Sequence, residues 1–294
     1  MSRPARLTVG VVSAGRVGTV LAAALARAGH TVVAASGVSA QSRHRADELL
    51  SGVPILPPDE TAAAADLVLL AIPDDALAGT VRGLAATGSL RQGQIVVHTS
   101  GAHGVEVLAP ALERGAMTLA VHPVMTFTGR AEDLDKLTSC HFGVTAADGQ
   151  DAAWHVGEAL VMEIGAEPVR VPEAVRPLYH AALTHGANHL VTLVNDCADL
   201  LTSAGIENSR GMIAPLLSAA LDNALRHGDR GLTGPVVRGD VGTVRTHRAV
   251  LADADPAALP GYLALARRTA QRAGAAGLLR PDVVAELLTV LDSR

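Results

Sequence analysis

LTVGVVSAGRVGTVLAAALARAG, residues 7–29, carries the pattern of a strand, a turn and a helix. A short apolar run breaks at a turn around Gly15 and Gly18, and a small-residue helix pattern follows from Thr19 to Ala28. Such a turn brings backbone N–H groups and the positive end of the helix dipole to one point, where a pyrophosphate can bind. The stretch therefore predicts a dinucleotide-binding turn at the start of an α/β sheet.

The turn is an incomplete version of the glycine fingerprint G-x-G-x-x-G. Gly15 would let the phosphates approach the backbone, and Gly18 would let the helix pack closely on the strand. The usual first glycine is replaced by Ser13. A partial motif alone is weak evidence, but its position at a strand–helix junction favours a dinucleotide site over a plain βα turn. The residues expected to contact the cofactor here are Ser13, Ala14, Gly15, Arg16, Val17 and Gly18.

The composition limits the classes of protein to consider. The 294 residues are 49% apolar, which fits two domains that each have a core. The net charge of −5 without a long basic run argues against nucleic acid or an anionic membrane as a partner. No apolar stretch reaches the roughly 18 residues of a membrane span. Cys140 and Cys197 lie far apart and form neither a disulfide framework nor a metal pair, as is typical of cytoplasmic proteins.

The second predicted strand, residues 30–36, ends without the acidic residue that binds the ribose 2′-hydroxyl in NAD-preferring folds. Hydroxyl and guanidinium side chains follow instead, and both suit a 2′-phosphate. They are Ser36, Ser39, Ser42, Arg43 and Arg45. With Ser36 and Arg43 as its ligands, this strand end favours NADP, and NAD is the alternative cofactor. An ordinary solvated helix start would also explain these residues.

Two further apolar runs end where the cofactor crevice of a parallel sheet should lie. Residues 66–72 run into Pro73, and residues 94–98 run into Ser100. We expect Ile72, Pro73 and Ser100 to line the crevice. Asp74 and Asp75 directly follow Pro73, and we interpret them as helix caps rather than catalytic carboxylates.

Histidines gather in the same part of the chain. His98 and His122 stand at or near predicted strand ends, where a nicotinamide ring and a substrate would lie, and His103 is close in sequence. The spacing of the three matches no metal motif, so no metal site is predicted.

The character of the sequence changes after Pro172. Residues 142–145 and 167–171 are the last predicted strands and complete a sheet of roughly seven or eight. The chain is thus predicted to be α/β. A Rossmann domain with a mostly parallel sheet spans residues 1–172, and an all-α domain for substrate binding and dimerisation spans residues 173–294. Its helices are expected at 174–204, 209–227, 241–251, 260–273 and 281–291.

The first helix of the second domain carries polar side chains on one face. At about 100° per residue, His180, Thr184 and Asn188 fall on one stripe of an otherwise apolar helix. Such groups are costly in a dry core without partners, so we expect the stripe to line a cleft between the domains. Structural hydrogen bonding is the alternative.

A second constellation is residues 232–240, LTGPVVRGD. Glycine and proline predict a loop, and Asp240 is expected to N-cap the helix that starts at Val241. Arg238 could clamp a substrate carboxylate bidentately. A salt bridge between domains or subunits is the alternative. We therefore name Thr184, Arg238 and Asp240 as candidate substrate-binding residues.

The order of a Rossmann domain and an all-helical domain resembles the 6-phosphogluconate dehydrogenase-like superfamily. That superfamily includes β-hydroxyacid dehydrogenases, ketopantoate reductases, pyrroline-5-carboxylate reductases and coenzyme F420-dependent NADP reductases. More closely, the chain resembles a bacterial family of Rossmann-like proteins whose C-terminal domain is of unknown function. The shared motifs are GRVGTVLA from Gly15, IPDD from Ile72, HTSGA from His98, HP at His122, YHAA from Tyr179 with Asn188, and LTGPVVRGD leading to His247.

The resemblance implies NADP-linked oxidoreduction of a small molecule by a homodimer. A 2-keto acid is the expected substrate, with ketopantoate the leading candidate. A non-catalytic NADP(H) sensor and an F420-dependent NADP reductase are the alternatives.

The chain departs from its relatives at the proton donor. β-Hydroxyacid dehydrogenases and ketopantoate reductases use a lysine four residues before an asparagine, but here Thr184 stands four residues before Asn188. We expect His180 to donate the proton, because histidine titrates near neutral pH, with His122 as the second candidate. Asn188 is expected to hydrogen-bond the substrate.

Overall fold

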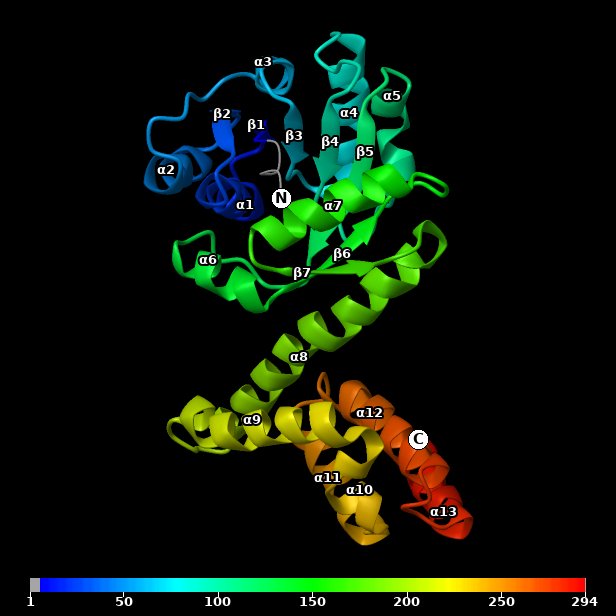
Figure 1. The fold of residues 1–294 in the computed structure, drawn as a ribbon. Helices are drawn as coiled ribbons and strands as arrows, with labels where there is room; N and C mark the ends of the chain where they lie inside the picture. The colour runs from blue at the N-terminus through cyan, green and yellow to red at the C-terminus, as the bar shows by residue number, and fades with distance from the viewer. Residues whose placement is uncertain (1–5, 294) are drawn as a thin grey trace. The chain divides into compact units, whose positions relative to one another are not determined.

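The computed structural model describes residues 6–293, which form two compact units (Figure 1). The first unit ends at Thr184, and the second begins at His185. None of the helices between residues 6 and 293 is long and apolar enough to cross a membrane.

The first unit is built on a seven-stranded sheet with the order β2-β1-β3-β4-β5-β6-β7. Its strands are β1 (Thr8–Val12), β2 (Thr31–Ala35), β3 (Leu67–Leu70), β4 (Ile95–His98), β5 (Met117–Pro123), β6 (His141–Thr145) and β7 (Glu167–Arg170). The first five strands are parallel, β6 runs antiparallel to β5, and β7 is parallel to β6. This confirms the predicted mostly parallel sheet. The strand order reverses between β1 and β3, and ligands of such sheets bind outside the carboxyl ends of the strands at that point.

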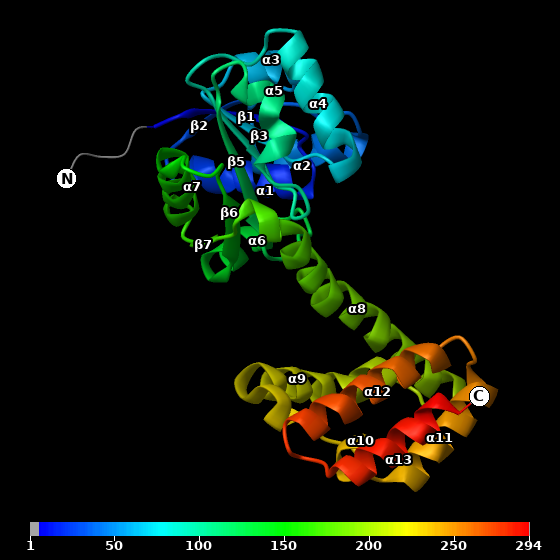
Figure 2. The same ribbon diagram turned by 90° about the vertical axis from the view of Figure 1, so that its right-hand side faces the viewer.

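Helices cover both faces of this sheet (Figure 2). They are α1 (Arg16–Arg27), α2 (Ala40–Leu49), α3 (Pro58–Ala63), α4 (Asp74–Ala86), α5 (Ala109–Leu112), α6 (Glu132–Lys136), α7 (Asp151–Glu163) and the start of α8 (Arg176–Ser203), with short 3₁₀ turns η1 (Val105–Leu108), η2 (Leu137–Ser139) and η3 (Glu173–Val175). Alternate residues of each strand point to opposite faces. Leu67 and Leu69 accordingly pack in the core beneath α1 and α7, whereas Val68 and Leu70 pack beneath α4 and α5.

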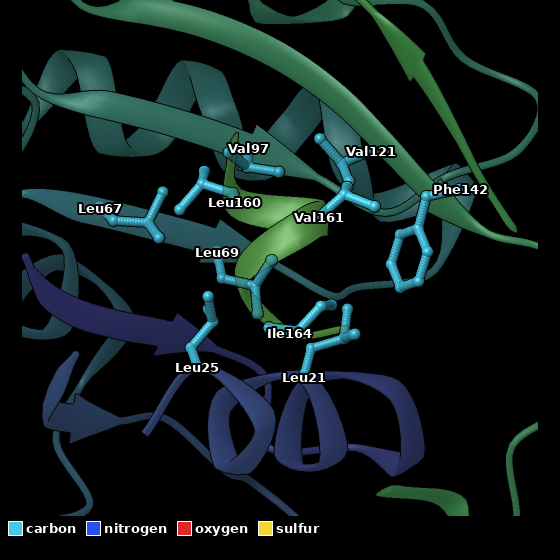
Figure 3. Close-up of a pocket in the computed structure, with 10 residues that line it drawn as sticks. All are labelled: Leu21, Leu25, Leu67, Leu69, Val97, Val121, Phe142, Leu160, Val161 and Ile164. Carbon is cyan, nitrogen blue, oxygen red and sulfur yellow. The ribbon is translucent and has the colours of Figure 1, made fainter. Parts of the chain in front are cut away.

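A small apolar cavity of about 40 Å³ lies in the core between α1, α7 and the sheet (Figure 3). Leu21 of α1, Leu69 of β3 and Val161 of α7 are among the side chains that line it. Ligand pockets usually measure about 300–1,000 Å³. The cavity is therefore a packing void of the core rather than a binding site.

The second unit is helical, as predicted. It contains the rest of α8, followed by α9 (Ser209–His227), η4 (Gly228–Gly231), α10 (Pro235–Arg238), α11 (Val241–Ala254), α12 (Leu259–Ala275) and α13 (Pro281–Asp292). Val236, Val244, Ala270 and Leu287 are among the buried residues of its small core. The division between the units falls within α8. The first turn of this helix belongs to the first unit, where Arg176 hydrogen-bonds to Thr145 and Ser100.

Two local predictions were wrong. Asp74 and Asp75 do not cap α4, since Pro73 holds the N-cap position and the aspartates lie in the first helical turn. Their charges can still interact favourably with the helix dipole there. The segment from Pro235 to Arg238 is a helical turn rather than a loop, because proline is well suited to the first position of a helix.

The predicted cap at Asp240 was also wrong in its chemistry. The residue does precede α11, but no side-chain hydrogen bond caps that helix. Its carboxylate instead accepts hydrogen bonds from Nε and Nη2 of Arg238, at 3.3 and 3.2 Å. A charged donor two residues away competes successfully with the backbone N–H groups.

Candidate functional site

The glycine turn is held in an unusual backbone conformation. Ser13 follows β1 with a φ of 77°, in the left-handed region that favours glycine. Its N–H donates to Oγ of Ser36 at 2.9 Å, and the N–H of Ala14 donates to the Ser36 carbonyl at 2.7 Å. Ser13 therefore takes the conformation of the first fingerprint glycine without being glycine, and the end of β2 holds it there.

Ser13→Gly is expected to raise the free energy of unfolding by about 1 kcal/mol, because glycine adopts this conformation without a steric penalty. Urea unfolding with an unchanged slope measures the gain. Ser39→Gly is the matched control. Ser39 has an ordinary φ of −86° and caps α2, so its replacement should cost a few tenths of a kcal/mol. A loss of stability in Ser13→Gly would show that the Ser13 side chain stabilises the turn.

The packing of α1 requires glycine at position 18 but not at position 15. A Cβ at Gly18 would clash with the carbonyl oxygen of Ser13 and lie 2.9 Å from Cβ of Ala71, so the close packing of α1 excludes a side chain there. A Cβ at Gly15 would meet only Oγ of Ser13 within the described chain, at 3.7 Å, and the φ of −74° suits any residue. The fold itself does not require glycine at position 15.

The N-terminus of α1 is open beside Gly15. No side chain within residues 6–293 caps this helix, and Thr19 donates its N–H to the Gly15 carbonyl. The N–H groups of Arg16, Val17 and Gly18 precede that bond, and such groups have no partner inside their own helix. The turn thus presents several donors and a positive dipole end to an anion.

Ser36 and Arg43 line one hollow of about 510 Å³ next to this turn. Gly37, Val38 and Pro57 are also part of its wall. The Arg43 guanidinium donates to the carbonyls of Gly37 and Val38, at 3.4 and 3.2 Å, which holds the side chain against the hollow. The structure thus brings together the two residues that the sequence predicts for a 2′-phosphate.

Several arginines around the turn have no acidic partner. In the part of the chain that the structure describes, no carboxylate lies within 4 Å of Arg16, Arg43, Arg45 or Arg130. Gly129 brings the loop after β5 close to two of them, because a Cβ there would lie 3.0 Å from Arg45 and 3.1 Å from Arg16. Uncompensated positive charge of this kind attracts a polyanion.

The ends of β3 and β4 are held by local contacts. Ile72 packs against the core beneath α4, and Pro73 leads into that helix. Ser100 donates its N–H to Nδ1 of His98, and Nε2 of His98 donates to the Gly104 carbonyl at 2.8 Å. Burial lowers the pKa of His98 to about 4, so this ring is a neutral structural bridge.

His122 and His180 come together beside Tyr179. Nδ1 of His122 on β5 lies 2.8 Å from the Tyr179 hydroxyl, and the rings of His122 and His180 are perpendicular with centroids 6.2 Å apart. Gly101 lies against both rings. A Cβ there would be 2.6 Å from Cδ2 of His180 and 2.9 Å from Nε2 of His122.

Tyr179 and His122 are both neutral at pH 7. Burial lowers the pKa of His122 to about 4, with help from the charges of Arg176 and His180, while Asp74 opposes the shift. Burial also raises the pKa of Tyr179, and Arg176 opposes that rise. A phenol that donates to Nδ1 leaves the ring proton of His122 on Nε2.

Arg176 is the functional candidate that the sequence prediction missed. Its side chain is fully buried, with Nη1 donating to Oγ1 of Thr145 at 2.6 Å and Nη2 donating to the Ser100 carbonyl at 2.7 Å. Its Nε has no hydrogen-bond partner, and no carboxylate among residues 6–293 lies within 4 Å of it. Burial lowers the pKa of Arg176, and Glu173, which lies beyond ion-pair distance, opposes that shift. A buried charge whose hydrogen bonds all go to neutral acceptors is costly. The one sequence signal was its position three residues before the Tyr179 motif.

The remaining predicted site residues are Thr184, Asn188, Arg238 and Asp240, and the last three belong to the second unit. Thr184 is half-buried at the end of the first unit, and Asn188 is exposed in the second. Arg238 and Asp240 pair with each other on the second unit, so the Arg238 guanidinium already faces a carboxylate. Their roles in substrate binding stay predictions. Within the described chain, no three His, Cys, Asp or Glu side chains gather closely enough to hold a metal ion.

The fold and the glycine turn define a two-domain protein of the Rossmann class. Residues 1–123 match the model of a Rossmann-like domain, and residues 140–269 match a domain of unknown function, DUF2520. The chain is therefore a Rossmann-like protein with a C-terminal DUF2520 domain, as the sequence motifs predicted. No curated protein matches the sequence.

Solved structures share this architecture over nearly the whole chain. A protein of Bacteroides fragilis provisionally assigned as an NADP oxidoreductase is 22% identical, with a TM-score of 0.75 over 90% of this chain and 98% of its own. An imine reductase from Pseudomonas sp. is 19% identical, with a TM-score of 0.64 over 98% and 100%. The Plasmodium falciparum pyrroline carboxylate reductase, solved with NADP bound, is 12% identical, with a TM-score of 0.57 over 96% and 98%. The fold is thus one found among NADP-linked oxidoreductases.

Proposed function

We propose that the protein is an NADP-dependent oxidoreductase that reduces a small 2-keto acid. The observation that carries the proposal is Gly15, a glycine that the fold does not require and that leaves the N-terminus of α1 open to a pyrophosphate. The fold's likeness to an imine reductase and to a pyrroline carboxylate reductase with bound NADP supports the same class.

The choice of NADP rests on the hollow at the end of β2. Ser36 and Arg43 line it, and no carboxylate within the described residues neutralises Arg43. A guanidinium and a hydroxyl suit a 2′-phosphate, whereas a ribose 2′-hydroxyl is usually bound by an acidic side chain. NAD should therefore bind more weakly than NADP.

The bound nicotinamide would supply a hydride for the carbonyl carbon of the substrate. The imidazoles of His122 and His180 lie together at the carboxyl end of β5, where a substrate of a parallel sheet is expected. One of them donates a proton or a hydrogen bond to the oxygen that gains negative charge. This pair replaces the lysine that related reductases use.

The buried charge of Arg176 favours an anionic substrate. It lies close enough to lower the pKa of His122, so the same field would stabilise a carboxylate or a developing alkoxide nearby. Ketopantoate is accordingly the first substrate to test. Imine reduction is the second candidate, because solved imine reductases share the fold. A cationic iminium would be disfavoured by the charge of Arg176.

The test is a screen for NADPH oxidation with ketopantoate, other 2-keto acids, pyrroline-5-carboxylate and oxidised coenzyme F420. We expect turnover with a 2-keto acid. Turnover with pyrroline-5-carboxylate or F420 alone would show that the proposed substrate class is wrong, while the assignment as an oxidoreductase would stand. Tight NADPH binding without any turnover would favour a sensor. A protein that binds no nucleotide would contradict the whole proposal.

We further infer that the protein is a homodimer through its second unit. Helix α9 is exposed along most of its length although it is rich in leucine, and α8 is exposed from His185 to Leu193. Exposed leucines on more than one side of a helix are typical of a surface that a partner covers. Leu216 and Leu225 have exposed fractions of 68% and 79% and lie on different sides of α9. A second copy of the chain would cover such a surface.

The double variant Leu216→Glu/Leu225→Glu should therefore be monomeric where the wild type is dimeric, because two charges would have to be buried in the interface. Sedimentation velocity measures the mass of each. Leu112→Glu, at an exposed leucine on α5 in the first unit, should stay dimeric. A monomeric wild type would rule the dimer out.

A further inference from the structure

Besides its proposed effect on an anionic substrate, Arg176 lies against a second group of the candidate site, Tyr179. Its guanidinium is buried between two neutral acceptors, with Cζ 5.9 Å from the centre of the Tyr179 ring. Proteins rarely keep a buried charge without a direct ion-pair partner unless it acts on something nearby. Its charge acts on His122 and on Tyr179, whose hydroxyl also lies within hydrogen-bond distance of His122.

We propose that Tyr179 is the source of the proton for the reduction, that His122 relays this proton to the substrate, and that Arg176 stabilises the phenolate left behind. The inference rests on the proposed function. As hydride reaches the carbonyl carbon, the carbonyl π bond breaks and its electron pair stays on oxygen. That oxygen takes the proton from Nε2 of His122, while Nδ1 takes the proton from the Tyr179 hydroxyl. His122 ends neutral, Tyr179 ends as a phenolate, and water returns a proton to Tyr179 before the next cycle.

His122 can donate a proton at neutral pH only with a proton source behind it, because it is not an imidazolium there. Burial, Arg176 and His180 all lower its pKa, and Asp74 alone among the charges that act on it raises the value. A neutral imidazole is a far weaker acid than a phenol, whose ordinary pKa is about 10. Coupling the ring to Tyr179 gives the substrate oxygen a phenol as its acid, although the phenol does not contact it.

Arg176 adjusts the acidity of that phenol. Burial raises the pKa of Tyr179 and the Cys140 thiol adds to the rise, while the guanidinium of Arg176 lowers it. The positive charge of Arg176 therefore stabilises the phenolate form, which burial destabilises. Glu173 also favours the charged form of Arg176, but its carboxylate lies beyond ion-pair distance. A phenolate on Tyr179 would give the buried arginine a closer negative partner after proton transfer.

Two glycines make room for the relay. Gly143 pairs with His122 across β5 and β6, and a Cβ there would lie 2.5 Å from the Tyr179 hydroxyl. Gly101 faces Nε2 of His122 with the same lack of space. Neither has a positive φ, so the close approach of Tyr179, His122 and His180, rather than backbone conformation, excludes side chains at these positions.

The test compares wild type with Tyr179→Phe, which removes only the hydroxyl. We expect kcat with the 2-keto acid to fall about 100-fold, a typical effect of losing an acid, while the Kd for NADPH stays unchanged. In wild type, kcat should fall as pH rises through the pKa of Tyr179, since the relay needs the protonated phenol. That fall should be absent in Tyr179→Phe. In Arg176→Met it should move to higher pH, because the charge that lowers this pKa is gone.

Nitrogen NMR of the His122 ring gives a readout that does not need turnover. Wild type should show the proton on Nε2 at neutral pH, and Tyr179→Phe should show a mixture of the two tautomers. The matched control is Tyr262→Phe. Tyr262 makes the same contact with a histidine, 3.1 Å from Nδ1 of His247, but in the second unit, and its loss should leave kcat unchanged.

Two results would overturn the relay while leaving the reductase intact. One is a wild-type His122 ring that carries its proton on Nδ1. The other is full kcat in a folded Tyr179→Phe variant. A wild type that turns over no 2-keto acid would instead remove the proposed function, and the relay with it.

Discussion

Gly15→Ala is expected to bind NADPH roughly 100-fold more weakly than wild type, a loss of about 2.7 kcal/mol, and to unfold at the same temperature. Alanine adopts the φ of −74° at this position without strain, and its Cβ would lie 3.7 Å from Oγ of Ser13. The fold thus has room for the methyl group. A bound pyrophosphate would leave no room for this methyl group, because it must approach the backbone at the start of α1 closely. Fluorescence titration gives the affinity, and calorimetry gives the Tm.

Gly18→Ala is the matched comparison. Its Cβ would clash with the carbonyl oxygen of Ser13, so α1 would have to move away from the sheet. Overpacking of this kind typically costs about 1–3 kcal/mol. The two variants should therefore separate binding from stability, since the first loses affinity and the second loses stability. If a well-folded Gly15→Ala variant bound NADPH as tightly as wild type, the nucleotide would not lie at this turn.

Features that depend on neighbouring residues could be predicted from the sequence. The strand, turn and helix around Gly15 follow from one local apolar pattern, and the helix from Ser209 to His227 was predicted with its observed bounds. The seven-stranded sheet follows from the alternation of strands and helices. The predicted cap at Asp240 was wrong although it depends on neighbouring residues. The sequence pattern does not indicate whether the carboxylate accepts from the backbone of α11 or from the Arg238 guanidinium.

The candidate site depended on contacts between distant parts of the chain. Arg176 is buried against Ser100 and Thr145, which follow or belong to strands far earlier in the sequence. An arginine next to a proline at a helix start gives no sign of burial by itself. His122 and His180 were named separately for their positions, at a strand end and on a polar stripe. Their closeness, and the hydroxyl of Tyr179 between the two elements, required the folded arrangement of β5 and α8.

His122→Asn is expected to lower kcat by about 10²- to 10⁴-fold with NADPH affinity unchanged, because a proton donor typically contributes that much. Asparagine is uncharged and can still donate a hydrogen bond, but it cannot pass a proton from Tyr179. Stopped-flow measurement of NADPH oxidation with a 2-keto acid measures the loss. In His180→Asn the Tyr179–His122 contact remains, so kcat should fall less than about tenfold.

The pH dependence of kcat, read together with these variants, decides which of the two imidazoles donates the proton. Because the pKa of His122 lies at about 4, its neutral ring is present throughout the neutral range, and kcat should be level from about pH 6 to pH 8. An imidazolium donor would behave in the opposite way, since activity would be lost as pH rises through its pKa. A kcat that falls as pH rises across this range, together with a large loss in His180→Asn, would assign the proton to His180. A level profile with the large loss in His122→Asn leaves a neutral ring as the group next to the substrate, and a neutral ring needs a proton source behind it.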